Sequence, residues 1–77
     1  MNAEMFLAMK HKKLILTLAE VCDEIGIAVG TGHNQVSNKT FPIPSRIQGK
    51  NRVVDIRDLG AYIDRERDIA RQAFDNY

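Results

Sequence analysis

Residues 16–27, which read LTLAEVCDEIGI, decide the fold. Thr17 and Glu20 have the S/T-x-x-E spacing of a capping box, in which the two side chains satisfy backbone N–H groups at the start of a helix. The apolar residues that follow have the i, i+3, i+4, i+7 spacing of one helix face: Leu18, Val21, Cys22 and Ile25. Glycine is the residue most often found just past a helix end. The stretch therefore predicts a short amphipathic helix that ends at Gly26.

The segment before this helix divides into two parts. Leu14, Ile15 and Leu16 form a short apolar run that predicts a buried extended segment. Residues 1–13 carry several apolar side chains followed by Lys10, His11, Lys12 and Lys13. We expect an N-terminal arm or helical turn here, and two interpretations stay open: a frayed terminus, or a basic arm that lies on phosphates.

A second short helix is predicted after a tight turn, over residues 28–37. Gly30 and Gly32 each cost about 1 kcal/mol relative to Ala in a helix interior, so tertiary packing must hold this helix. Its exposed face is expected to carry short hydrogen-bonding side chains and no acid: Thr31, His33, Asn34, Ser37 and Asn38. Such side chains suit base edges and phosphates. His33 is either a contact of this kind or an ordinary surface residue.

Two prolines end the second helix, because Pro42 and Pro44 lack a backbone donor and favour extended geometry before them. Short runs then flank a glycine-containing turn of three residues, Gly49-Lys50-Asn51. Residues 46–48 and 52–56 are expected to be the two strands of a β-hairpin. A basic hairpin after two short helices is called a wing.

A long final helix is predicted from Arg57, because apolar residues return at helical spacing: Leu59, Tyr62, Ile63, Ile69, Ala70 and Phe74. Asp55 and Asp58 lie near its start, where the helix dipole favours acids. Beyond Asp64 the apolar positions become sparse, and the mixed charges are expected to pair along a solvated face. This last part, residues 65–77, either docks on the body of the protein or binds a partner chain.

Length and composition limit the chain to one small domain. Its 77 residues are 44% hydrophobic, as in a globular protein, and the only cysteine, Cys22, excludes an internal disulfide. Cys22 is expected to be a core residue rather than a reactive thiol. The sequence has neither an apolar run of membrane-spanning length nor a signal peptide, which predicts a cytoplasmic protein.

The net charge of +1 conceals a segregated charge distribution. No acidic residue occurs between Ile25 and Val54, whereas this window contains four basic ones: Lys39, Arg46, Lys50 and Arg52. A surface that faces phosphates needs such segregation, because each Lys or Arg placed against the backbone releases counterions. The alternative is a solvated face that happens to lack acids.

Catalysis is not expected. His11 and His33 are far apart in the sequence and neither has metal-ligand spacing, and Gly30-Thr31-Gly32 lacks the lysine of a phosphate-binding loop. A chain of this length also offers little room for a concave site. We therefore predict a non-enzyme with no catalytic residue, no metal site and no cofactor.

Four stretches together carry a resemblance to a known family: residues 16–27, 29–36, 41–47 and 52–63. They resemble the AlpA and excisionase-like group of helix-turn-helix proteins, which is related to MerR-type DNA-binding domains. The resemblance covers residues 14–64 and implies a mostly α-helical fold with a small β-hairpin, a winged helix-turn-helix. Gly32 and Gln35 depart from the pattern, since apolar residues are common in the family at these positions. This departure predicts a looser second helix or a partner chain that covers a gap.

The resemblance also implies a function. Members of this group bind double-stranded DNA in tandem copies, bend it, and direct excision by an integrase or control transcription in phages and mobile elements. The expected DNA-binding residues of the recognition helix are Gly30, Thr31, His33, Asn34, Ser37, Asn38 and Lys39, and those of the wing are Arg46, Lys50, Asn51 and Arg52. The C-terminal helix is expected to mediate self-association. A protein-binding antirepressor module remains the alternative from a different class.

Overall fold

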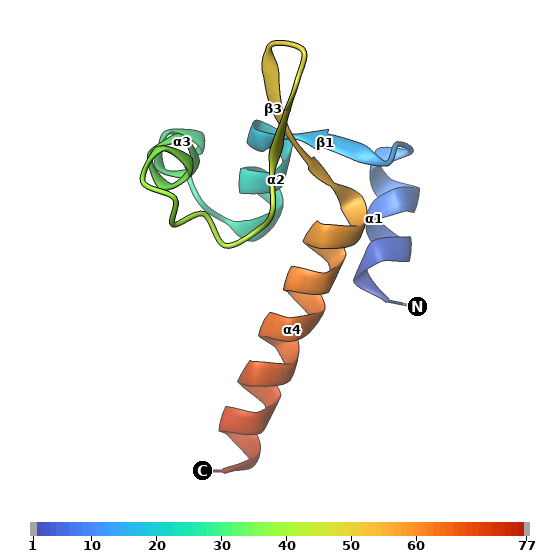
Figure 1. Cartoon of the computed structure of the whole chain (residues 1–77). Helices are drawn as coiled ribbons and strands as arrows, with labels where there is room; N and C mark the ends of the chain where they lie inside the picture. Colours follow the sequence, from blue (N-terminus) through green and yellow to red (C-terminus); the bar gives the residue numbers. More distant parts are fainter. Residues whose placement is uncertain (1, 77) are drawn as a thin grey trace.

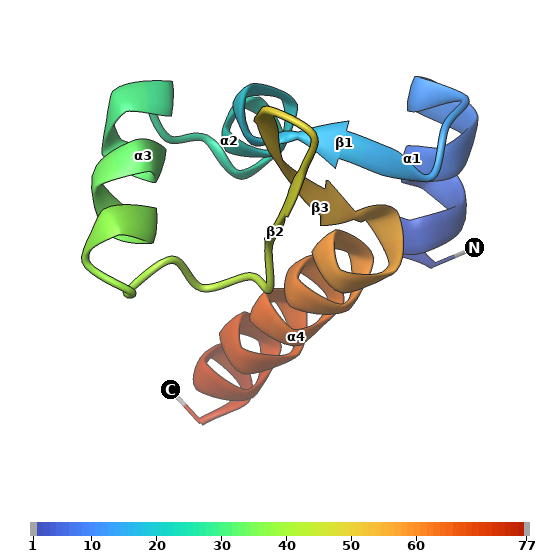
Figure 2. The ribbon, with the colours of Figure 1, turned by 45° about the horizontal axis from the view of Figure 1, so that its top comes forward.

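Three short antiparallel strands lie at the centre of the computed structural model, which describes residues 2–76 (Figure 1). In chain order the elements are α1 (Ala3–His11), β1 (Ile15–Thr17), α2 (Leu18–Ile25), α3 (Val29–Ser37), β2 (Arg46–Gln48), β3 (Asn51–Asp55) and α4 (Ile56–Asp75). α1 and α3 lie on opposite sides of the sheet, and α4 extends away from it (Figures 1 and 2). The described chain is thus mostly helical around a small sheet.

The sheet contains the predicted hairpin and one further strand. Its order is β1-β3-β2, with Leu16 opposite Val54 and Gln48 opposite Asn51. Because Gln48 pairs with Asn51, the turn consists of Gly49 and Lys50 alone, and the predicted three-residue turn is wrong. Gly49 adopts a φ of +65°, which a side chain at that position would disfavour. The remaining strand of the sheet is β1, which is formed by the extended segment that was expected before α2.

A single cluster of buried aliphatic side chains joins the sheet to the helices. Its members are Leu7, Leu16, Val21, Ile43, Val54, Ile56 and Leu59. Two predictions about nearby residues are wrong. Leu14 does not join the buried run but is 67% exposed. Ile56 is not the end of a strand but the first residue of α4, which Asp55 caps by accepting from the Arg57 N–H at 2.8 Å.

The N-terminal segment is an ordered helix, so the frayed-terminus interpretation is wrong. The Asn2 side chain accepts from the Met5 N–H and caps α1, whose Leu7 is 4% exposed. α1 lies directly on α4 at Gly60. A Cβ at Gly60 would come within 2.8 Å of the backbone nitrogen of Glu4. Only glycine permits this approach of the two helices.

α2 begins and ends as predicted. The capping box is confirmed, since Thr17 Oγ1 accepts from the Glu20 N–H at 3.2 Å and Glu20 Oε1 accepts from the Thr17 N–H at 2.9 Å. Gly26 ends the helix with a left-handed φ of +81°. Cys22 is 1% exposed, which confirms its place in the core. The capped helix therefore presents a fixed inner face to α3.

The sequence predicted a gap in the packing at Gly32, and this prediction is wrong. α3 packs directly on α2 at this residue. Gly32 is buried, and a Cβ there would collide with Sγ of Cys22. The glycine thus marks a close approach of two helices rather than a missing anchor. Gln35 is half-buried, and its Oε1 has no hydrogen-bond partner within residues 2–76.

α4 is continuous but has two different environments. Ile56, Leu59 and Gly60 are buried in the body, whereas residues 65–76 are exposed throughout. This exposed part, which we call the tail, projects from the body, so the expectation that it docks there is wrong (Figure 1). The predicted ion pairs along the tail are also not formed within the described chain. Arg65 instead lies 5.9 Å from the centre of the Tyr62 ring.

None of the helices that the structure describes combines the length and the apolar character needed to cross a membrane.

Candidate nucleic-acid interface

The outer face of α3 carries the polar side chains that the sequence placed there. Gly32 turns inward against α2, so the residues around it face solvent, and the five predicted side chains are all exposed: Thr31, His33, Asn34, Ser37 and Asn38. Gly30 is exposed as well, with open space where a Cβ would lie. Lys39 follows the helix in a left-handed conformation, with φ of +59°. The face offers donors and acceptors and no carboxylate.

The hairpin β2–β3 supplies most of the positive charge. Arg46, Lys50 and Asn51 are exposed, and Arg46 donates to Gln48 Oε1 at 3.4 Å. Arg52 is half-buried and donates from Nη1 to Ser45 Oγ at 3.0 Å. This hydrogen bond orients one nitrogen of the guanidinium and leaves its other N–H groups available.

Three elements meet in a hollow of about 230 Å³, which we call the junction hollow. Its lining comes from the first turn of α2, the outer face of α3 and the hairpin: Thr17, Leu18, Ala19, His33, Lys50, Asn51 and Arg52. Four of the predicted site residues, one on α3 and three on the hairpin, therefore converge. The α2 residues were missed, although the capping box marks a helix start whose N–H groups lack intrahelical acceptors.

A second hollow of about 320 Å³ shares Arg52 with the junction hollow. Its lining is Val36, Lys39, Phe41, Ile43, Ser45 and Arg52. It adds Lys39 to the residues that the fold brings together. The remaining predicted residues line neither hollow: Gly30, Thr31, Asn34, Ser37, Asn38 and Arg46. Those on α3 stand on its open face instead.

Four basic residues after α3 and on the hairpin form no salt bridge within residues 2–76: Lys39, Arg46, Lys50 and Arg52. The acids at the edge of this surface already have cations of their own. Lys13 donates to Glu20 at 2.9 Å and holds the pKa of Glu20 at about 2, together with the Thr17 N–H. Arg57 likewise holds the pKa of Asp55 at about 2. The charge of Arg46 also helps to lower the pKa of Asp55, but the surface of α3 and the hairpin remains positive overall.

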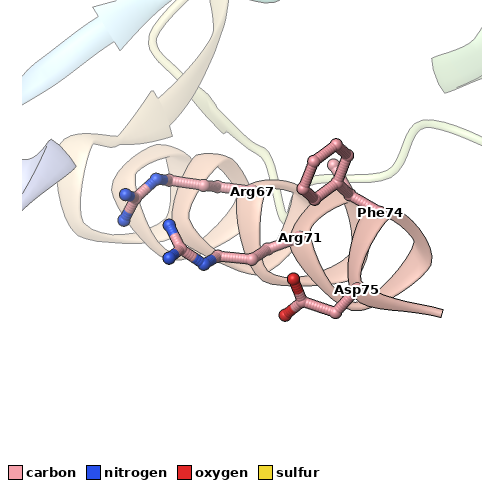
Figure 3. A pocket seen from close by; sticks show the side chains of 5 residues that line it. Arg67, Arg71, Phe74 and Asp75 are labelled. Carbon is pink, nitrogen blue, oxygen red and sulfur yellow. The ribbon is translucent and has the colours of Figure 1, made fainter. Parts of the chain in front are cut away.

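Two further surfaces lie outside α3 and the hairpin. A hollow of about 250 Å³ between α1 and the start of α4 is lined by Glu4, Met5, Ala8, Leu14, Ile56 and Arg57, and it includes an acid. A shallow surface on the tail is lined by Arg67, Ala70, Arg71, Phe74 and Asp75 (Figure 3). All five belong to one face of a single helix, so they enclose nothing. Burial raises the pKa of the Cys22 thiol, which keeps it protonated and unreactive. Residues 2–76 contain no group of three or more His, Cys, Asp or Glu side chains placed to hold a metal ion.

Comparisons of the chain with protein-family models, with curated proteins and with solved structures found no match. The function is therefore argued from the geometry and charge of the interface.

Proposed function

We propose that the chain is a winged helix-turn-helix protein that binds double-stranded DNA, with α3 as the recognition helix and β2–β3 as the wing. One observation carries the proposal: α3 and the hairpin form a single surface on which no basic residue forms a salt bridge within residues 2–76. Phosphate backbones reward such cations through counterion release. A merely solvated face has no need to exclude acids from thirty consecutive positions, 25–54.

The dimensions of α3 suit the major groove. An α-helix with its side chains is about 10–12 Å across, which fits a groove about 12 Å wide, and the nine residues of α3 give it about two and a half turns with which to contact bases. Gly32 seats the helix on α2, so Thr31 and Asn34 are free to face base edges. Asparagine can pair with adenine through two hydrogen bonds, and this makes Asn34 the residue that we assign to base reading. Lys50 at the hairpin turn then reaches the neighbouring backbone or minor groove.

The biological role that we propose is that of an excisionase-like directionality factor, a small cytoplasmic protein of a bacterial mobile element that bends DNA for an integrase. A single module of this size buries only about 600–1,000 Å² on DNA, so several adjacent copies or a dimer are required for useful affinity. The exposed tail, with Ile69 and Phe74 at 55% and 68% exposure, is the surface that we assign to self-association. Transcription control by the same fold is the nearest alternative.

Fluorescence anisotropy with labelled duplexes from the DNA that flanks the gene tests the DNA-binding proposal. We expect salt-dependent binding that Asn34→Ala weakens on the preferred sequence far more than on random DNA. Lys12→Gln is the matched control, because Lys12 is exposed and lies at the end of α1, outside the interface. An absence of salt-dependent binding to any duplex contradicts the proposal.

A plasmid excision assay separates the directionality factor from the transcription regulator. The cognate integrase is assayed on an attachment-site plasmid with and without the protein. A shift of the product ratio toward excision supports the directionality factor, and an unchanged ratio contradicts it.

The exposed apolar residues of the tail favour a second candidate, an antirepressor that occupies a protein partner. In that case the tail alone carries the function, and Arg46→Gln and Lys50→Gln are silent. A variant that ends at residue 64 distinguishes the two candidates. If the chain binds DNA through α3 and the hairpin, this variant retains binding to a single site and loses only cooperativity between sites.

A further inference from the structure

We propose that the junction hollow seats one phosphate group of the DNA backbone. The inference deepens the proposed function and rests on it. It adds the first turn of α2 to the interface and assigns a specific role to His33 and Lys50, which would hold a phosphate between the recognition helix and the hairpin.

The charge of the hollow suits an anion. Lys50 and Arg52 contribute two permanent positive charges, and the imidazole of His33 supplies a donor beside them. None of the lining residues is acidic. The nearest acid, Glu20, is occupied, because its Oε1 accepts from Lys13 Nζ at 2.9 Å and from the Thr17 N–H at 2.9 Å. No unpaired carboxylate of the described chain therefore opposes an anion here.

The donors of the hollow come from all three of its walls. On the α2 side the capping box uses the Thr17 hydroxyl, which accepts from the Glu20 N–H. The N–H group of Ala19, in the first turn of α2, has no acceptor within the helix. Arg52 has one nitrogen on Ser45 and further N–H groups free, and Lys50 is exposed without an ion pair in the described chain. A tetrahedral phosphate can accept from several of these donors together.

Such a contact positions the protein and does not read sequence. Phosphate contacts fix the register and orientation of a protein on the duplex. A phosphate bound between α3 and the hairpin ties these two elements to the same strand, and this sets how deeply α3 enters the groove. Loss of the contact is therefore expected to weaken binding to every duplex alike, in contrast to loss of Asn34.

Inorganic phosphate is the direct probe of the hollow. We titrate phosphate against chloride at constant ionic strength and follow backbone amide signals by NMR. Saturable shifts are expected at Leu18, Ala19 and Asn51, and they are expected to vanish in Lys50→Gln/His33→Gln. Lys12→Gln serves as the charge-matched control and should keep the shifts. If no saturable shift occurs at these amides in the wild type, the proposal is overturned.

Binding to a random-sequence duplex of about 20 base pairs is the second measurement. Lys50→Gln is expected to lower the affinity about fivefold and to reduce the slope of log K against log[salt] by about one. His33→Gln is expected to lower the affinity by a smaller factor, and Lys12→Gln to leave both quantities unchanged. If wild type binds the duplex but Lys50→Gln keeps its affinity and slope, the phosphate seat is wrong and DNA binding stands. If wild type binds no duplex, the proposed function itself fails. Melting curves of each variant show that it is folded.

Discussion

The α1–α2 face and the α3–hairpin face both carry several basic residues, but only the first pairs them with acids. Lys10 and His11 both contact Glu24, at 2.6 and 2.8 Å, and Lys13 contacts Glu20 at 2.8 Å. On the other face Lys39, Arg46, Lys50 and Arg52 form no salt bridge within residues 2–76. A cation paired inside the fold joins two helices, whereas an unpaired cation on an open surface is available to a ligand. The net charge of +1 averages over these two situations.

The largest expected effect on DNA binding comes from removal of charge from the open face. Arg46→Gln/Lys50→Gln is expected to lower the affinity for duplex DNA by more than about tenfold at physiological salt, since the proposed interface loses two cations that release counterions. Its melting temperature should change little, because neither side chain forms a salt bridge in the described chain. Anisotropy titrations and thermal melts measure the two quantities.

The matched variant on the paired face is Lys10→Gln/Lys13→Gln, which removes the same charge. It is expected to lower the melting temperature by a few degrees and to change DNA affinity less than about twofold, because its cations already contact Glu24 and Glu20. Equal losses of affinity in both double variants would show that only total charge matters, and the comparison would then fail.

The next effect concerns the glycine that seats α1. Gly60→Ala is expected to destabilise the protein by about 2–3 kcal/mol, because the new Cβ would lie 2.9 Å from the Cα of Glu4 and backbone atoms cannot rotate away. Chemical denaturation measures the loss. Affinity of the folded protein for DNA should be retained, since α1 and α4 meet away from the interface. Ala61→Gly, at an exposed position of the same helix, is the control and should cost no more than about 1 kcal/mol.

A smaller loss is expected at the corresponding glycine of the open face. Gly32→Ala brings its Cβ against Cys22 Sγ, a side-chain atom, so we expect a loss of about 1–2 kcal/mol. Cys22→Ala removes that sulfur, and the double variant should recover part of the loss. This coupling, measured in a double-mutant cycle, isolates the collision with Cys22 from the gain in helix propensity that Gly→Ala brings by itself. Simple additivity of the two changes would contradict the close contact.

Most of the fold could be predicted from local patterns. The capping box of Thr17 and Glu20, the glycine at position 26 and the hairpin around Gly49 all act within a few residues, so the sequence specifies them directly. What could not be predicted depends on distant partners. The docking of α1 depends on Gly60, which lies far along the chain from Glu4, and the inward face of Gly32 depends on Cys22.

The same distinction applies to the interface. The polar face of α3 and the basic hairpin follow from residue type and spacing, and the exposure of the predicted α3 side chains is confirmed. The convergence of Thr17, His33 and Lys50 in one hollow requires three elements to be placed in space. Spacing along the chain contains no information on that placement, so the contribution of α2 was missed.

The smallest expected effect is on acid stability, and it arises from the acids that already have partners. The folded-state pKa of Glu20 is about 2, below its ordinary value of 4.5, because Lys13 and the Thr17 N–H bind the carboxylate. A lowered pKa stabilises the folded state above pH 4.5, and this stabilisation is lost as the pH falls toward 2. The pKa of Asp55 is likewise lowered from 3.8 to about 2, because Arg57 binds the carboxylate, so its stabilisation is also lost as the pH falls below 3.8. The free energy of unfolding should therefore decrease between pH 4.5 and 2.

Glu20→Gln tests which face causes this decrease. Glutamine keeps an acceptor for the capping box but has no titrating charge, so the variant should be less stable at neutral pH, by less than about 1 kcal/mol, and should lose less stability on acidification. Asp68→Asn on the exposed tail is the control and should follow the wild-type curve. Asp55, at the end of β3, and Glu24, which contacts Lys10, also have lowered pKa values, so a fall of stability that Glu20→Gln leaves unchanged would point to these groups. Such a result would show that the ion pair between Lys13 and Glu20 does not stabilise the α1–α2 face.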